Sequence, residues 1–201
     1  MYQNTFLLLN GNAPKDTTSL KKADYIVCAD GAFNWAKHCC KPDIIVGDMD
    51  SILQLPKDIA TKILPKNKDC TDGQIGLRHL IELCAKSITI MGYRGGRADH
   101  EFFNYFLLAE GTLKTSCCIE DDDFFVQIVN KNIKKNIGKN KIVSLSPFLG
   151  SVHISYTKGL LYKIQDASFG LCNVAPISNV SVDDTIEIAV KSGTVLVFYQ
   201  K

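Results

Sequence analysis

The chain has 201 residues, a formal net charge of +2 and 46% hydrophobic residues. This length allows one large domain or two small ones, with enough apolar content for a real core. The near-neutral charge gives no argument for a nucleic-acid partner, and no apolar run is long enough to span a membrane. The first ten residues lack the basic start and long apolar run of a signal peptide, so we expect a cytoplasmic protein.

The first part of the chain alternates short apolar runs with segments of helical character. Runs typical of buried strands are 5–9, 25–29, 43–47 and 87–91. The expected helices are 32–40, 56–63, 75–84 and 102–108. Thr71 and Asp72 stand where they would cap the third of these helices. Such alternation predicts an α/β domain with a mainly parallel sheet, which we place at residues 1–116.

After residue 116 the pattern changes to short extended runs separated by glycine or asparagine. These runs are 116–119, 124–129, 141–145, 152–156, 185–190 and 194–199. They show no helical period, so we expect an all-β sandwich domain at residues 117–201. The lysine-rich segment 131–141 is interpreted as a solvated hairpin rather than an anion site.

Two acidic residues follow the third predicted strand directly. Asp48 and Asp50 lie in the sequence Ile-Ile-Val-Gly-Asp-Met-Asp-Ser (44–51), and an extended backbone would point both to one side. The carboxyl ends of strands in an open α/β sheet face the ligand crevice. Two carboxylates there suit Mg²⁺, which binds through one or two carboxylates and substrate phosphates. The alternative for this segment alone is a polar turn that caps the next helix.

Further charged residues and glycines occupy neighbouring loops. The additional aspartates are Asp30, Asp72 and Asp99. Five carboxylates at one crevice would repel one another, and a divalent cation with a polyphosphate would relieve that cost. Glycines at 92, 95 and 96 let backbone N–H groups approach a phosphate, which Arg97 can bind bidentately. The chain has neither a P-loop nor a dinucleotide fingerprint.

Several polar residues admit two interpretations. His100 is either an acid–base group or a capping or exposed histidine. Ser51 either binds a phosphate oxygen or caps a helix. The eight cysteines include no C-x-x-C pair, which favours reduced thiols without a metal. Cys28 and Cys84 lie in apolar runs and are expected to be buried.

Taken together, these segments resemble the thiamin pyrophosphokinase family. In the first part of the chain the resemblance is carried by Ala-Asp-Gly-Ala (29–32), Gly-Asp-Met-Asp-Ser (47–51), Thr-Asp (71–72) and Gly-Gly-Arg-Ala-Asp-His (95–100) with Asn104. In the second part it is carried by Gly-Leu-Leu-Tyr (159–162), Ser-Asn (178–179) and Val-Lys-Ser-Gly (190–193). The resemblance covers nearly the whole chain, from about residue 25 to residue 198.

The resemblance implies a reaction and its partners. Diphosphate would pass from ATP to the hydroxyethyl group of thiamine, giving thiamine diphosphate and AMP. The enzyme would need Mg²⁺ and would be a homodimer with sites between subunits. Either Asp72 or Asp99 would accept the proton of the thiamine hydroxyl.

The resemblance also implies which residues form the site. Those implied to hold Mg²⁺ are Asp48, Asp50 and Asp72, with Asp30 beside them. Those implied to bind the nucleotide are Gly31, Ser51, Thr71, Arg97 and His100. Those implied to lie near thiamine are Asp99, Ser178 and Asn179.

The chain departs from the family's pattern in three places. The family often has T-D-x-E-K where this chain reads Thr-Asp-Gly-Gln-Ile (71–75), so that the glutamate and lysine are missing. The family's D-G-G is Asp-Gly-Ala (30–32) here, and no aromatic is evident beside Ser178 and Asn179. Two other functions stay open, a metal-dependent phosphoesterase and a non-catalytic nucleotide- or thiamine-binding protein.

Overall fold

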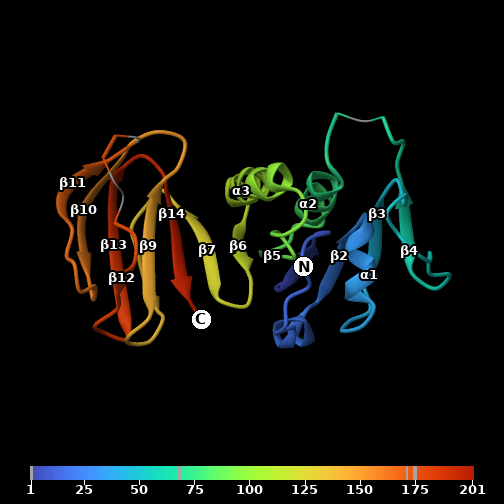
Figure 1. Cartoon of the computed structure of the whole chain (residues 1–201), viewed down its shortest axis with the longest axis horizontal. Helices are drawn as coiled ribbons and strands as arrows, with labels where there is room; N and C mark the ends of the chain where they lie inside the picture. Colours follow the sequence, from blue (N-terminus) through green and yellow to red (C-terminus); the bar gives the residue numbers. More distant parts are fainter. Residues whose placement is uncertain (1, 68, 171, 174–175) are drawn as a thin grey trace. The chain divides into compact units, whose positions relative to one another are not determined.

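The chain divides into two compact units, Met1–Asp122 and Asp123–Lys201. The computed structural model describes residues 2–67, 69–170, 172–173 and 176–201 (Figure 1). Within these described ranges no helix is both long and apolar enough to cross a membrane. The division lies after residue 122 rather than after residue 116, because the strand at 116–120 pairs with a strand of the first unit.

The first unit is built on a parallel sheet, as the alternating pattern predicts. Its strands are β1 (Thr5–Leu8), β2 (Tyr25–Ala29), β3 (Ile44–Gly47), β4 (Ala60–Ile63), β5 (Ser87–Met91) and β6 (Ser116–Glu120). Within this unit their order is β6-β5-β1-β2-β3-β4, and every neighbouring pair is parallel. The strand order reverses between β1 and β5, and such a switch point is where open α/β sheets bind ligands.

The helices of this unit connect the parallel strands. They are the 3₁₀ helices η1 (Thr18–Lys22) and η2 (Asp30–Ala32) and the α-helices α1 (Phe33–Ala36), α2 (Asp72–Glu82) and α3 (Ala98–Thr112). Thr71 caps α2 as expected: its hydroxyl accepts a hydrogen bond from the Gln74 N–H, and the Gln74 side chain accepts one from the Thr71 N–H. α1 is shorter than expected, whereas α3 begins earlier, at Ala98.

Two expectations for the first unit were wrong. Residues 56–63 contain no helix, and β4 pairs in parallel with β3 instead. All four residues of β4 are exposed, so a short helix here would lack the buried face on which helices depend. Cys28 is buried as expected, but Cys84 is exposed because the chain turns at a φ of 55° there, after the end of α2.

Two glycines let α2 lie directly on the sheet. A Cβ atom added to Gly76 would lie 2.6 Å from Leu7 Cδ1 and 3.1 Å from Val27 Cγ1. A Cβ atom added to Gly73 would lie 3.1 Å from Leu9 Cδ2. Leu7 is completely buried, so its side chain has no solvent to move into. The close approach brings the first residue of α2 to the carboxyl edge of the sheet.

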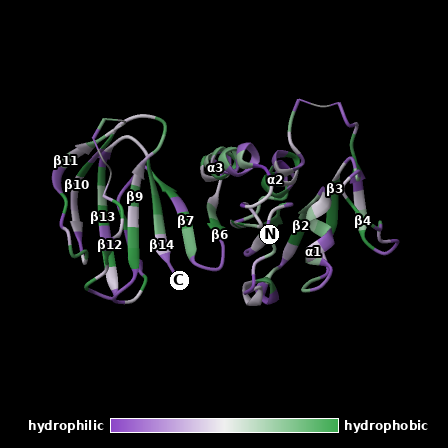
Figure 2. Cartoon of the chain, viewed as in Figure 1, coloured by the Kyte–Doolittle hydropathy of each residue, from purple (hydrophilic) through white to green (hydrophobic). Residues whose placement is uncertain are grey.

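The second unit is the expected β-sandwich. Its strands are β7 (Phe124–Val129), β8 (Ile133–Asn136), β9 (Ile142–Pro147), β10 (Val152–Lys158), β11 (Gln165–Phe169), β12 (Asn179–Val180), β13 (Thr185–Ser192) and β14 (Val195–Gln200). They pair in the orders β12-β9-β14-β7 and β11-β10-β13-β8. Residues of both sheets, such as Val143 and Ile154, share one core, and Figure 2 shows the hydrophobic stretches along β7, β9 and β14.

The lysine-rich segment 131–141 contains an edge strand that the pattern did not predict. This strand, β8, pairs in an antiparallel manner with β13. Lys134 extends into solvent and its Nζ lies 3.1 Å from an oxygen of Glu187 on β13. Charged side chains are typical of strands at the edge of a sheet, where they oppose pairing with other chains.

We expect Gly76→Ala to destabilise the first unit. The added methyl group would overpack a buried site, which outweighs the usual gain of alanine over glycine in a helix. Equilibrium unfolding in urea should show a free energy of unfolding lower by about 1–2 kcal/mol. Glu82→Ala, at an exposed position of the same helix, is the control and should change stability little. Unchanged stability of Gly76→Ala would contradict the close packing of α2.

Candidate active site

Three aspartates from separate segments converge at the carboxyl edge of the parallel sheet. Asp30 follows β2, Asp48 follows β3, and Asp72 is the first residue of α2. Each offers a carboxylate oxygen, and these oxygens lie within 4.8 Å of one another. Asp30 is buried, and its Oδ1 has no hydrogen-bond partner among the described residues. A buried carboxylate oxygen without a partner is costly, so the arrangement calls for a cation.

A glycine makes this convergence sterically possible. A Cβ atom added to Gly47 would lie 2.8 Å from the Asp30 Cβ and 3.2 Å from the Asp72 Cγ. The φ of Gly47 is 151°, which other residues rarely adopt. Any side chain at position 47 would therefore push two of the three carboxylates apart.

The donor set of this cluster fits a hard divalent cation. Asp30, Asp48 and Asp72 provide carboxylate oxygens alone, and oxygen ligands of this kind suit Mg²⁺ or Mn²⁺. Asp72 also lies in the first turn of α2, where the helix dipole favours negative charge. The cluster could thus hold a divalent cation at the carboxyl edge of the sheet.

Asp50, which the sequence placed with Asp48, lies outside this cluster. The backbone between them does not stay extended, because Met49 has a φ of 65°. The Asp50 carboxylate lies 2.7 Å from Lys66 Nζ and accepts a hydrogen bond from Ser51 Oγ at 3.0 Å. The hydrogen bond from Lys66 lowers the pKa of Asp50. The next element is β4, so neither Asp50 nor Ser51 caps a helix.

The glycine-rich loop that follows β5 is held by α3. Glu101 accepts a hydrogen bond from the Gly95 N–H at 3.1 Å, and Asn104 Nδ2 donates to the Tyr93 carbonyl oxygen at 2.6 Å. Gly95 and Gly96 have φ values of 93° and 79°, and no heavy atom lies within 4 Å of a Cβ added to Gly96. The loop therefore has an open face at Gly96, where a ligand can approach the backbone.

Arg97 and Asp99 pair with each other. Arg97 Nε and one terminal nitrogen donate to the two oxygens of Asp99, at 3.1 Å and 2.6 Å. The hydrogen bond from Arg97 lowers the pKa of Asp99 to about 2. His100 is exposed, and its backbone N–H also donates to Asp99. Because the pair is exposed to solvent, exchanging Asp99 for a phosphate as the partner of Arg97 would cost little.

The loop that follows β1 lies next to Gly31 and to the switch point between β1 and β5. The Asn10 side chain covers Gly31, where an added Cβ would lie 2.3 Å from Asn10 Nδ2. A cavity of about 240 Å³ opens at the carboxyl ends of β1, β5 and β6, and its lining includes Asn12, Arg94 and Asp121. Residues 10–12 were not predicted to be part of the site, because no sequence motif marks them.

Asn179 in the second unit is used within the fold rather than exposed for a ligand. It is buried, and its Oδ1 accepts hydrogen bonds from the backbone N–H groups of Tyr162 and Val180 at 3.0 and 2.9 Å. Its Nδ2 donates to the Tyr162 carbonyl oxygen at 2.7 Å. Ser178 is exposed with a φ of 57°, and its N–H donates to Ser144 Oγ.

The residue that Asn179 holds is an aromatic that sequence reasoning did not find near the Ser-Asn pair. Tyr162 is 66% exposed, and its neighbour Leu161 is 54% exposed. Tyr162 stands 17 residues before Asn179, so closeness in sequence gave no sign of the contact. The available signal was Gly-Leu-Leu-Tyr (159–162), one of the segments that carry the family resemblance.

The chain thus combines an α/β unit, which has a carboxylate cluster at the edge of its sheet, with a β-sandwich unit. Residues 17–119 match the family described as "Thiamin pyrophosphokinase, catalytic domain". A thiamine pyrophosphokinase of Bacillus subtilis is 31% identical over 144 residues, a stretch that spans 66% of each chain. The chain therefore belongs to the thiamin pyrophosphokinase family.

Solved structures of this family have the same fold. The crystal structure of thiamine pyrophosphokinase from Bacillus subtilis matches with a TM-score of 0.86 at 21% identity, covering 99% of both chains. The yeast thiamin pyrophosphokinase structure matches with a TM-score of 0.80 at 17% identity, covering 99% of this chain and 86% of that one. These likenesses confirm the expected fold, an α/β domain followed by an all-β sandwich.

Gly47→Ala tests the steric role of Gly47. The added methyl group would displace Asp30 or Asp72, so we expect the Mg²⁺ concentration for half-maximal turnover to rise at least about tenfold. Gly170→Ala is the control, because its nearest contact would be an ordinary one of 3.7 Å. If Gly47→Ala retained the normal Mg²⁺ dependence, the three carboxylates would not act as one site.

Proposed function

We propose that this protein is a working thiamin pyrophosphokinase, which transfers diphosphate from ATP to the hydroxyethyl group of thiamine and releases AMP. The observation that carries the proposal is the cluster of Asp30, Asp48 and Asp72 at the sheet edge, in a chain of that family. A cytoplasmic location and a homodimer with sites between subunits belong to the same proposal and come from the sequence and the family resemblance.

The first unit would bind the polyphosphate. Asp30, Asp48 and Asp72 would hold Mg²⁺, which neutralises phosphate charge when it is bound. Arg97 would exchange its partner Asp99 for a phosphate, because the planar guanidinium group can donate hydrogen bonds to two phosphate oxygens. Gly31, Ser51, Thr71 and His100 stay candidates for nucleotide contacts. The open face at Gly96 offers backbone N–H groups to the same anion.

The transferred group needs alignment more than it needs a strong base. Phosphoryl transfer passes through a loose transition state, so catalysis rests on positioning and charge neutralisation. Asp99 has a pKa of about 2 while Arg97 donates to it, which makes it a weak base in that state. The Asp72 carboxylate belongs to the cluster with Asp30 and Asp48, where it would bind the cation. Either residue would serve mainly to orient the thiamine hydroxyl. The Asp50 carboxylate is paired with Lys66 instead.

The second unit would bind thiamine through Tyr162. The thiazolium ring of thiamine carries a positive charge, and an exposed aromatic face attracts such a cation. Asn179 would act through Tyr162, since its amide fixes the backbone of that residue on both sides. Ser178, which is exposed next to Asn179, would contact the substrate directly.

The other two functions predict different products. The comparisons favour neither a metal-dependent phosphoesterase nor a non-catalytic binding protein. An assay of AMP and thiamine diphosphate, with and without thiamine and Mg²⁺, separates the three functions. Formation of AMP only when thiamine and Mg²⁺ are both present supports the kinase. Release of free phosphate supports the hydrolase, and ligand binding without any product supports the binding protein.

Asp48→Asn should lower Mg²⁺-dependent turnover by orders of magnitude, because it removes a cation ligand. Asp30→Asn should behave alike. The fold should survive in both, because each change relieves repulsion among clustered carboxylates. Asp58→Asn is the matched control, since Asp58 forms an exposed pair with Lys41 at 2.8 Å in the same unit. Near-normal turnover of Asp48→Asn and Asp30→Asn would refute the assignment of the cluster.

Tyr162→Ala should raise the KM for thiamine roughly tenfold, because a desolvated cation–π contact contributes about 1–2 kcal/mol. Tyr162→Phe keeps the ring and should stay within about threefold of the native KM. The KM for ATP should change little in both variants. If Tyr162→Ala had a normal KM for thiamine, the ring would not belong to the thiamine site.

A further inference from the structure

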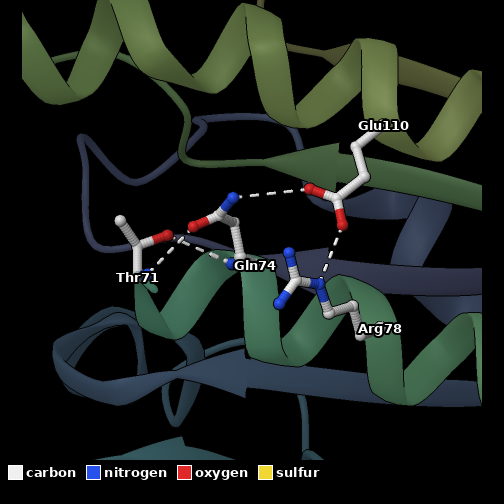
Figure 3. A network of polar contacts seen from close by, with 4 residues as sticks. All are labelled: Thr71, Gln74, Arg78 and Glu110. Carbon is white, nitrogen blue, oxygen red and sulfur yellow. Dashed lines mark hydrogen bonds and ion pairs between the residues drawn. The ribbon is translucent and has the colours of Figure 1, made fainter. Parts of the chain in front are cut away.

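A chain of polar contacts joins the start of α2 to α3 (Figure 3). The Gln74 side chain accepts a hydrogen bond from the Thr71 N–H at 3.1 Å and donates one from Nε2 to Glu110 Oε2 at 3.4 Å. Arg78 Nε donates to Glu110 Oε1 at 2.8 Å. Glu110 thus receives one bond from each of two residues, one turn apart on α2.

Only an amide side chain suits position 74 in this arrangement. It must accept from the Thr71 N–H through its oxygen and donate to Glu110 through its nitrogen, and an amide does both at once. An ionised glutamate would preserve the capping box, because it accepts equally well. It would, however, face the Glu110 carboxylate with no proton to donate. The difference between glutamine and glutamate at this position therefore lies in the link to α3.

The network that ties Glu110 to Gln74 and Thr71 ends next to Asp72, a residue of the carboxylate cluster. Asp72 lies between the cap residue Thr71 and the rest of α2. The first backbone N–H groups of a helix have no partners within it, so an uncapped first turn frays. A cap that is also tied to α3 holds that turn, and with it the Asp72 carboxylate, against a second helix.

We propose that Gln74 is a positioning residue for Asp72, acting through its paired contacts with Thr71 and Glu110. The inference rests on the proposed function in one respect, that Asp72 is a ligand of the cation. It also accounts for a departure from the family's pattern. Where T-D-x-E-K has a glutamate and a lysine, this chain has Gln74 and Ile75, and Arg78 supplies a positive charge to Glu110 from the next turn.

The test compares Gln74→Glu, Glu110→Gln and the double variant that carries both changes. Mn²⁺ is the probe, and its affinity is measured by electron paramagnetic resonance without nucleotide or thiamine. Gln74→Glu should weaken Mn²⁺ binding about tenfold or more, as is typical when a partner of a metal ligand is lost. The double variant should recover to within about threefold, because the amide introduced on α3 would then donate to the carboxylate introduced on α2.

The direction of the change separates positioning from plain charge. A new carboxylate near the cluster would by itself strengthen the binding of a cation. Tighter or unchanged binding in Gln74→Glu would therefore overturn the proposal. A double variant as weak as Gln74→Glu would overturn it as well, since the contact between positions 74 and 110 would not be the cause. Thermal unfolding of each variant verifies that the fold is intact.

Asp72→Asn keeps the inference distinct from the proposed function. If this variant binds Mn²⁺ normally, Asp72 is not a cation ligand, and the proposed site itself fails. If Asp72→Asn loses binding while Gln74→Glu does not, the site stands and the positioning role of Gln74 is wrong.

Discussion

Repulsion among Asp30, Asp48 and Asp72 is the constraint around which the first unit is arranged. The carboxylate oxygens lie within 4.8 Å of one another, and two unit charges at that limit repel by roughly 3–4 kcal/mol at an effective dielectric constant of about 20. The N-terminus of α2 offsets part of this charge, because its dipole favours the negative charge of Asp72. A divalent cation bound by these carboxylate oxygens would offset the repulsion, which is the basis of the proposed cation site.

In both units the backbone, rather than long flexible side chains, positions the carboxylates and the aromatic ring assigned to the site. Gly47 leaves the space that Asp30 and Asp72 occupy, and Gly76 lets α2 lie against β1. In the second unit, Asn179 uses its whole amide to hold the backbone of Tyr162, which leaves the tyrosine ring exposed. Groups held in this way lose little entropy when a ligand binds, which favours catalysis by positioning.

The sequence predicted the fold class, and it singled out Asp30, Asp48 and Asp72, which lie together in the structure, because local patterns mark the ends of strands and the start of a helix. Strands 25–29, 87–91 and 124–129 have the predicted limits, and Thr71 caps α2 as its sequence indicates. The failures involve either local conformations that leave no mark in the sequence or contacts between residues distant in sequence. The exposed edge strand β4 carries no apolar period, and the turn at Met49 that separates Asp50 from Asp48 leaves no mark in the pattern. The Tyr162–Asn179 contact joins residues that only the folded sheet brings together.

The most direct test of the shared cation site is a crystal structure of the protein soaked with Mn²⁺, in which anomalous scattering locates the ion. The arrangement of the cluster predicts one peak about 2.0–2.3 Å from oxygens of Asp30, Asp48 and Asp72 together. A peak held by Asp48 and Asp50 with neither Asp30 nor Asp72 as a ligand would contradict it. A saturated crystal with no peak at this edge of the sheet would contradict it equally.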